Sequence, residues 1–187
     1  MNRTIILMRH GQPQLDEFGK LSALDMKDWI EHYNQSGITR QPAPDASLEL
    51  AATATVIVSS SAPRALTSVR ALGLKPSLVD ALFCEAQLPY GRWKLPRLSP
   101  FTWAFVLRLL WLCGYSPGVE SAATAKGRAC AGAQQLQSMA SEGTVLLLGH
   151  GLMNRMIARQ LAANGWTREK PSGNRYWSPQ VYHCDGG

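Results

Sequence analysis

The stretch TIILMRHG, residues 4–11, decides the fold. Its apolar run, residues 5–8, does not alternate with polar residues, which predicts a strand buried on both faces. Ligands of open α/β sheets bind at the carboxyl ends of the strands, where Arg9 and His10 would stand. A cation and an imidazole followed by a glycine suit a group that attacks and holds an anion. Taken alone, however, the triplet is better explained as the end of a strand, so the rest of the chain has to decide.

A second stretch, TVLLLGHG at residues 144–151, repeats the same arrangement, with His150 directly after an apolar run. A further short apolar run, residues 56–58, leads into SSSAPRA, where Pro63 is placed to begin a helix and Arg64 falls in its first turn. The ends of parallel strands face the same side of a sheet. We therefore expect the two histidines to meet there, with Arg9 and Arg64 beside them, and helix amides to favour an anion.

Apolar runs alternate with helical patterns along the whole chain. We expect a third strand at residues 78–83, an additional edge strand in the tail, and helices at the following ranges: 21–33, 65–72, 101–112, about 120–139 and 152–164. This order predicts a three-layer α/β/α fold with a mainly parallel central sheet and a small helical cap insertion at about residues 88–118. No linker divides the chain, so residues 1–187 are expected to form a single domain.

Composition limits the function. The chain has 187 residues, 45% of them hydrophobic, and a formal net charge of +6, which favours an anionic partner such as a phosphorylated metabolite. No dense block of Lys and Arg indicates nucleic-acid binding. The four cysteines are not at zinc-site spacing, so we expect no metal, and they suit a reducing compartment. With no secretory leader recognised, we expect a cytoplasmic protein. The sequence does not indicate an oligomeric state.

Four blocks together resemble the histidine phosphatase superfamily, also called the phosphoglycerate-mutase-like family. They are LMRHGQ at residues 7–12, VSSSAPRA at 58–65, LFCE at 82–85 and LLGHG at 147–151. The resemblance spans almost the whole chain in the right order, and it implies the phosphoglycerate-mutase-like fold. It also implies that His10 is the nucleophile that becomes phosphorylated, that Arg9, Arg64 and His150 complete the phosphate pocket, and that Glu85 is the proton donor.

The chemistry supports these roles. A neutral imidazole nitrogen can attack phosphorus and give a phosphohistidine that water then opens. A carboxylic acid such as Glu85 can protonate the departing alkoxide. Two arginines and a second, protonated histidine can stabilise the transferring phosphoryl group without a metal. We therefore expect no cofactor and a small phosphorylated substrate or inorganic phosphate as the partner.

Some positions are open to more than one interpretation. Glu85 has a second interpretation as a solvated carboxylate, because the residues that usually follow the acid in the family are absent here. Asp16 is a fallback acid that a solvated loop explains better. Gln12 holds a position that often faces the pocket in the family, so it is expected to bind phosphate.

The insertion sets substrate choice in this family, and here it is first basic and then apolar. Arg92, Lys94 and Arg97 are candidates for contacting further negative charge on the substrate. Three tryptophans, Trp93, Trp103 and Trp111, either stack on a substrate ring or hold the cap in place. The apolar helix is too short to cross a bilayer, which takes about 20 residues, so no membrane insertion is expected and interfacial attachment is a minor alternative.

The sequence thus predicts a metal-independent phosphatase that hydrolyses a phosphomonoester through phospho-His10. Two alternatives remain. One is a phosphoglycerate-mutase-like phosphotransferase that returns the phosphate to a substrate. The other is a non-catalytic module that binds a phosphorylated ligand.

Overall fold

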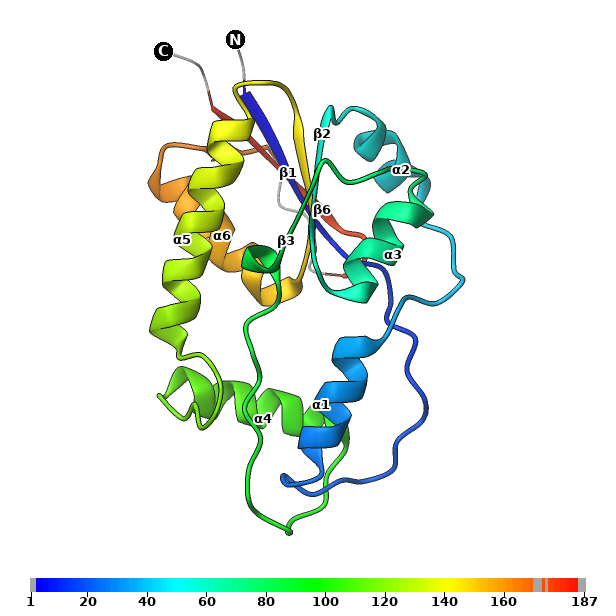
Figure 1. Ribbon diagram of the computed structural model, residues 1–187, viewed down its shortest axis with the longest axis vertical. Helices are drawn as coiled ribbons and strands as arrows, with labels where there is room; N and C mark the ends of the chain where they lie inside the picture. The colour runs from blue at the N-terminus through cyan, green and yellow to red at the C-terminus, as the bar shows by residue number, and fades with distance from the viewer. Residues whose placement is uncertain (1–2, 170–172, 174, 185–187) are drawn as a thin grey trace.

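The computed structural model describes residues 3–169, 173 and 175–184 (Figure 1). In this part of the chain, six strands form one sheet in the order β3-β2-β4-β1-β6-β5. The strands are β1 (Arg3–Arg9), β2 (Val56–Ser60), β3 (Leu78–Asp80), β4 (Val145–Gly149), β5 (Thr167–Arg168) and β6 (Pro179–Cys184). The neighbours from β3 to β1 pair in parallel, whereas β6 is antiparallel to both β1 and β5.

Helices cover both faces of this sheet. Helices α5 (Ala122–Met139) and α6 (Gly151–Ala163) lie on one side, and α2 (Asp45–Ala52) and α3 (Pro63–Ala71) lie on the other (Figure 1). Side chains of β1 alternate between the two layers: Ile5 and Leu7 pack in the cluster that includes residues of α5 and α6, and Ile6 and Met8 in the cluster that includes residues of α2 and α3. The expected three-layer fold with a mainly parallel sheet is confirmed.

Three sequence expectations about elements were wrong in detail. The third strand stops at Asp80, whose carboxylate accepts from the N–H of Leu82 and begins a 3₁₀ turn, Ala81–Phe83. The tail strand β6 is not an edge, because it lies between β1 and β5. The first helix, α1 (Met26–Gln35), starts five residues later than expected, since the backbone of Leu21 pairs with Leu98 instead.

Two helices lie beyond the carboxyl ends of the parallel strands, α1 and α4 (Pro100–Leu112), at the bottom of Figure 1. They pack on each other through a cluster that includes Trp29 of α1 and Trp103 and Leu107 of α4. The cap is therefore built from two distant segments, of which the sequence predicted only the second. In the part of the chain that is described, no helix is long and apolar enough to span a membrane.

Candidate active site

The sheet order brings two histidines together. Strand β4 lies directly beside β1, with Arg9 in register with Gly149, so His10 and His150 follow neighbouring strand ends. Their rings lie 5.0 Å apart, edge to face, and both side chains are buried. Asn154 of α6 joins the two strand ends through its side-chain amide. Its Nδ2 donates to the carbonyl of Met8, and its Oδ1 accepts from the N–H of His150; both distances are 3.2 Å. No local pattern in the sequence indicates this role of Asn154.

His10 is held as one neutral tautomer. Its Nδ1 lies 2.7 Å from the carbonyl oxygen of Gly11. A carbonyl only accepts, so Nδ1 carries the proton and Nε2 keeps its lone pair. Burial, followed by the charge of Arg64, lowers the pKa of His10 to about 3. The imidazole is therefore a neutral potential nucleophile at physiological pH.

His150 is also neutral in this ligand-free structure. Its Nε2 lies 2.7 Å from Oγ of Ser60, and its buried Nδ1 has no hydrogen-bond partner among the described residues. Burial, with Arg64 as the next cause, holds the pKa of His150 well below its usual range. The protonated second histidine expected beside a transferring phosphoryl group stays a prediction. Only a negative charge in the site would offset the arginines and favour the protonated ring.

Each candidate arginine lies over a tyrosine ring that the sequence did not single out. The guanidinium carbon of Arg64 lies 4.6 Å from the ring centre of Tyr33, and Nη1 donates to the carbonyl of Tyr33. The guanidinium carbon of Arg9 lies 4.3 Å from the ring centre of Tyr176. Arg64 is only 2% exposed, so it is held rigidly at the start of α3. The spacing of Trp29 and Tyr33, which stack one helical turn apart, was the available signal for Tyr33.

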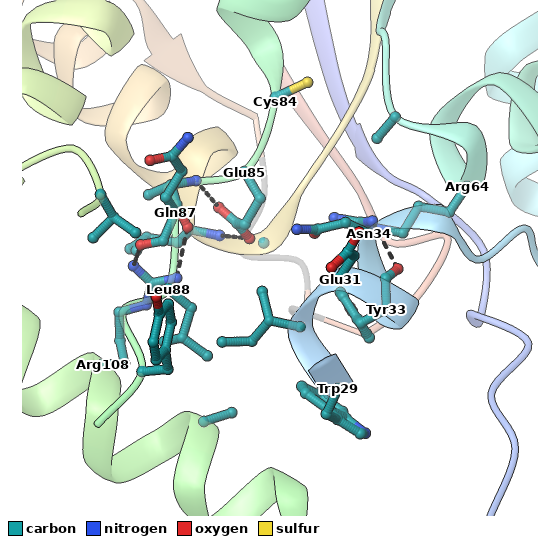
Figure 2. Close-up of a pocket in the computed structure, with 18 of the residues that line it drawn as sticks. Trp29, Glu31, Tyr33, Asn34, Arg64, Cys84, Glu85, Gln87, Leu88 and Arg108 are labelled. Atoms are coloured by element: carbon teal, nitrogen blue, oxygen red, sulfur yellow. Dashed lines mark hydrogen bonds between the residues drawn. The ribbon is translucent and has the colours of Figure 1, made fainter. Parts of the chain in front are cut away.

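Glu85 lies across the cavity from Arg64 (Figure 2). Its carboxylate accepts from three backbone N–H groups, those of Ala86, Leu152 and Met153. The last two belong to the first turn of α6, so Glu85 also caps this helix from a distant loop. The carboxylate therefore has a structural role, and its role as proton donor stays a prediction.

A cavity of about 910 Å³ lies between the strand ends and the α1–α4 cap. Arg9, Arg64, Glu85 and Tyr176 line it, whereas His10 lies behind them, with its ring 5.7 Å from that of Tyr176. No cluster of three His, Cys, Asp or Glu suited to a metal ion occurs in the described residues.

Comparison with solved structures agrees with this architecture. An open-reading-frame product of Mycobacterium tuberculosis shares 19% identity over 96% of this chain and 90% of its own, with a TM-score of 0.61. Phosphoserine phosphatase from Entamoeba histolytica, in complex with 3-phosphoglyceric acid, shares 18% identity over 86% and 80% of the chains, with a TM-score of 0.55. Mycobacterial glucosyl-3-phosphoglycerate phosphatase with VO3 shares 22% identity over 86% and 81%, with a TM-score of 0.53.

The chain has the phosphoglycerate-mutase-like fold. No protein-family model and no curated protein matches the sequence itself.

Several residues expected to bind substrate do not reach the main cavity of this phosphoglycerate-mutase-like fold. Gln12 lines a neighbouring cavity of about 530 Å³, which Arg9 and Tyr176 also border. Arg92, Lys94 and Arg97 are exposed and line neither cavity, and Arg97 pairs with Asp25 at 3.8 Å. Leu98 at the end of their loop pairs with Leu21, and the three charged side chains are exposed to solvent. The cations that line the main cavity beyond Arg9 and Arg64 are Lys27, Arg108 and Arg155.

The three cap tryptophans do not line the cavity either. Trp103 and Trp111 are buried in the packing of α4, so they hold the cap in place. Trp93 stacks on Tyr115, 5.7 Å away. The aromatic wall of the cavity is formed instead by Trp29, Tyr33, Tyr90, Phe101, Phe105 and Tyr176.

Proposed function

We propose that this protein is a phosphomonoester hydrolase of the histidine phosphatase superfamily that acts through phospho-His10. The observation that carries the proposal is the hydrogen bond from Nδ1 of His10 to Gly11, because it leaves the Nε2 lone pair available beside His150 and two arginines. The phosphoglycerate-mutase-like fold, shared with solved phosphatases, supports the same assignment.

In the first step Nε2 of His10 attacks phosphorus, and the bond from phosphorus to the ester oxygen breaks. The departing alkoxide takes a proton from Glu85, which is expected to supply roughly 10²–10⁴-fold of the rate. In the second step water attacks the phosphohistidine and gives a proton to Glu85, and inorganic phosphate leaves with His10 restored. Arg9 and Arg64 stabilise the charge on the phosphoryl oxygens in both steps.

The second histidine gains its role when the anion is present. A phosphoryl group offsets the charge of Arg64, which favours a protonated His150 that donates to a phosphoryl oxygen. Because His10 is only 2% exposed, side chains around it, such as the neighbouring Tyr176, have to move for a substrate to reach Nε2. The proposal includes metal independence and a small phosphorylated substrate. It also includes a cytoplasmic location, because the scattered cysteines of the sequence suit a reducing compartment.

The test is hydrolysis of p-nitrophenyl phosphate in the presence of a chelator, by the intact chain and by His10→Asn. We expect turnover by the intact chain and none by the variant, because asparagine has no ring nitrogen that can be phosphorylated. Rapid quenching with labelled substrate should trap a phosphoprotein that is stable in base and labile in acid. Equal turnover by His10→Asn would overturn the mechanism. Phosphate binding without turnover would favour a non-catalytic module, and transfer of label to a second metabolite would favour a mutase.

A further inference from the structure

The wall of the cavity changes character away from the arginines. Arg64 and Glu85 reach toward each other near the strand ends, and Trp29 of the cap lies farther from them (Figure 2). The cap side of the wall is mainly apolar, with Trp29, Leu88, Phe101, Ala104 and Phe105 among its residues. The cavity volume of about 910 Å³ is near the upper end of ligand pockets, which span roughly 300–1,000 Å³. A phosphate group alone fills only a small part of this space.

Two phenylalanines of this wall are largely exposed, although the ring of Phe101 packs edge-on against that of Trp29. Phe101 is 63% exposed and Phe105 is 65% exposed, although both line the cavity. They lie one helical turn apart on α4, so their rings form a continuous apolar surface. An apolar group in the cavity would remove this surface from water, which is favourable in proportion to the buried area.

The additional cations at the cavity do not form a second anion site. The guanidinium of Arg108 donates to the carbonyls of Ala86 and Gln87, at 2.7 and 3.0 Å, and lies over the ring of Trp111. Nε of Arg155 donates to the carbonyl of Gly151. These arginines brace the loop after Glu85 and the first turn of α6. Beside the single charge of the exposed Lys27, the cap side of the cavity thus offers mainly its apolar wall.

We infer that the substrate is a phosphomonoester with an extended apolar leaving group, such as an alkyl or aryl chain, and that this group lies against Phe101 and Phe105 while the phosphate lies between Arg9 and Arg64. The inference rests on the proposed phosphatase function and specifies its substrate class. It assigns the cap helix α4 to substrate recognition through its aromatic side chains rather than through the basic residues of the preceding loop.

The test uses ethyl, butyl and octyl phosphate, with glycerol 1-phosphate as a polar comparison, all below the concentrations at which micelles form. The simple alkyl alcohols differ little as leaving groups, so differences in kcat/KM report binding of the chain. We expect kcat/KM to rise from ethyl to octyl phosphate, by roughly tenfold for every two methylene groups that become buried. Glycerol phosphate should be hydrolysed no better than ethyl phosphate. A flat dependence on chain length, or a preference for glycerol phosphate over butyl phosphate, would overturn the inference.

A pair of variants on α4 locates the effect. Phe105→Ala should lower the ratio of kcat/KM for octyl over ethyl phosphate by roughly tenfold, and Phe101→Ala should do the same if Phe105→Ala folds poorly. Leu109→Ala is the matched control, since Leu109 lies one turn farther along α4, is 47% exposed and does not line the cavity. We expect the ratio of kcat/KM for octyl over ethyl phosphate in Leu109→Ala to equal that of the unchanged protein. If Phe105→Ala and Leu109→Ala lowered the octyl-to-ethyl ratio of kcat/KM equally, the alkyl chain of the substrate would lie on the outer surface of α4, and the inference would be overturned.

The outcomes also separate this inference from the proposed function. Hydrolysis of p-nitrophenyl phosphate without any preference for long chains overturns the substrate class and leaves the phosphatase function standing. Absence of turnover with every phosphomonoester, p-nitrophenyl phosphate included, overturns both.

Discussion

The Nδ1 atom of His10 lies 2.7 Å from the carbonyl oxygen of Gly11, the next residue in the chain. Within this short contact the backbone itself selects the tautomer, without any carboxylate partner. The conformation also requires a glycine, because a Cβ at position 11 would come within 2.5 Å of the Trp177 ring. Gly11 thus allows close packing against Trp177 and also holds the ring of His10 through its carbonyl.

The low pKa of His10 predicts how stability depends on pH. The folded protein leaves His10 neutral down to about pH 3, whereas the unfolded chain takes up a proton near the ordinary value of 6.5. Between these values the unfolded state binds more protons, so the free energy of unfolding falls as the pH is lowered. Urea unfolding should show about 2 kcal/mol more loss between pH 7.5 and pH 5 in the intact chain than in His10→Asn. The same pH dependence in both proteins would show that His10 is protonated in the folded state.

Replacement of Arg64 by lysine should weaken anion binding. The buried guanidinium offers a planar fork that lysine lacks, so Arg64→Lys should raise the Kd for orthovanadate, an analogue of the phosphoryl transition state, by roughly 10- to 100-fold. Isothermal titration calorimetry measures this directly. Arg92→Lys makes the same chemical change at an exposed position away from the cavity, and its Kd should equal that of the unchanged protein. Similar losses in both variants would contradict the assignment of Arg64.

Glu85→Gln separates acid catalysis from helix capping. Glutamine keeps one acceptor oxygen for one of the two N–H groups of α6, which bind different oxygens of Glu85, and it cannot protonate a leaving group, so the comparison of two substrates has to separate the two effects. Hydrolysis of ethyl phosphate should therefore fall by about 10²–10⁴-fold, while p-nitrophenyl phosphate, whose leaving group needs little protonation, should lose much less. Steady-state kinetics with both substrates supply the comparison. Equal losses would mean that Glu85 acts only by positioning α6.

Removal of the Asn154 amide should destabilise the protein. Asn154→Ala leaves the carbonyl of Met8 and the N–H of His150 without this partner in a buried site, so the free energy of unfolding should fall by about 1–3 kcal/mol. Asn164→Ala, at the exposed end of the same helix, should change it by no more than about 0.5 kcal/mol. Denaturant unfolding tests both variants. A loss in Asn154→Ala as small as in the control would show that the two strand ends do not depend on this bridge.

Local patterns predicted the residues that follow directly from strand ends. His10, His150 and Arg64 each stand after an apolar run, so the parallel sheet brings them together without further information. Their catalytic roles stay predictions. The stacking of Arg9 on Tyr176 was not predictable in this way, because it depends on where the tail returns to the sheet.

In the cap, the sequence did not predict which charged side chains face the cavity. The charges of Arg92, Lys94 and Arg97 were visible, but charge alone does not reveal which side of a loop faces a cavity. That direction is set by pairing of Leu98 with Leu21, a contact between distant segments. Likewise, no local pattern indicates that the carboxylate of Glu85 caps a helix that begins far along the chain.

The antiparallel pairing of β6 with β1 has a consequence for how the protein is made. Strand β1, which leads to His10, is synthesised before β6, its neighbour on one side and the last strand that the structure describes. Tyr176 and Trp177, which pack on Arg9, His10 and Gly11, also emerge late. A nascent chain that lacks this segment therefore lacks the side chains that pack on Arg9, His10 and Gly11, and the surroundings of His10 are still incomplete.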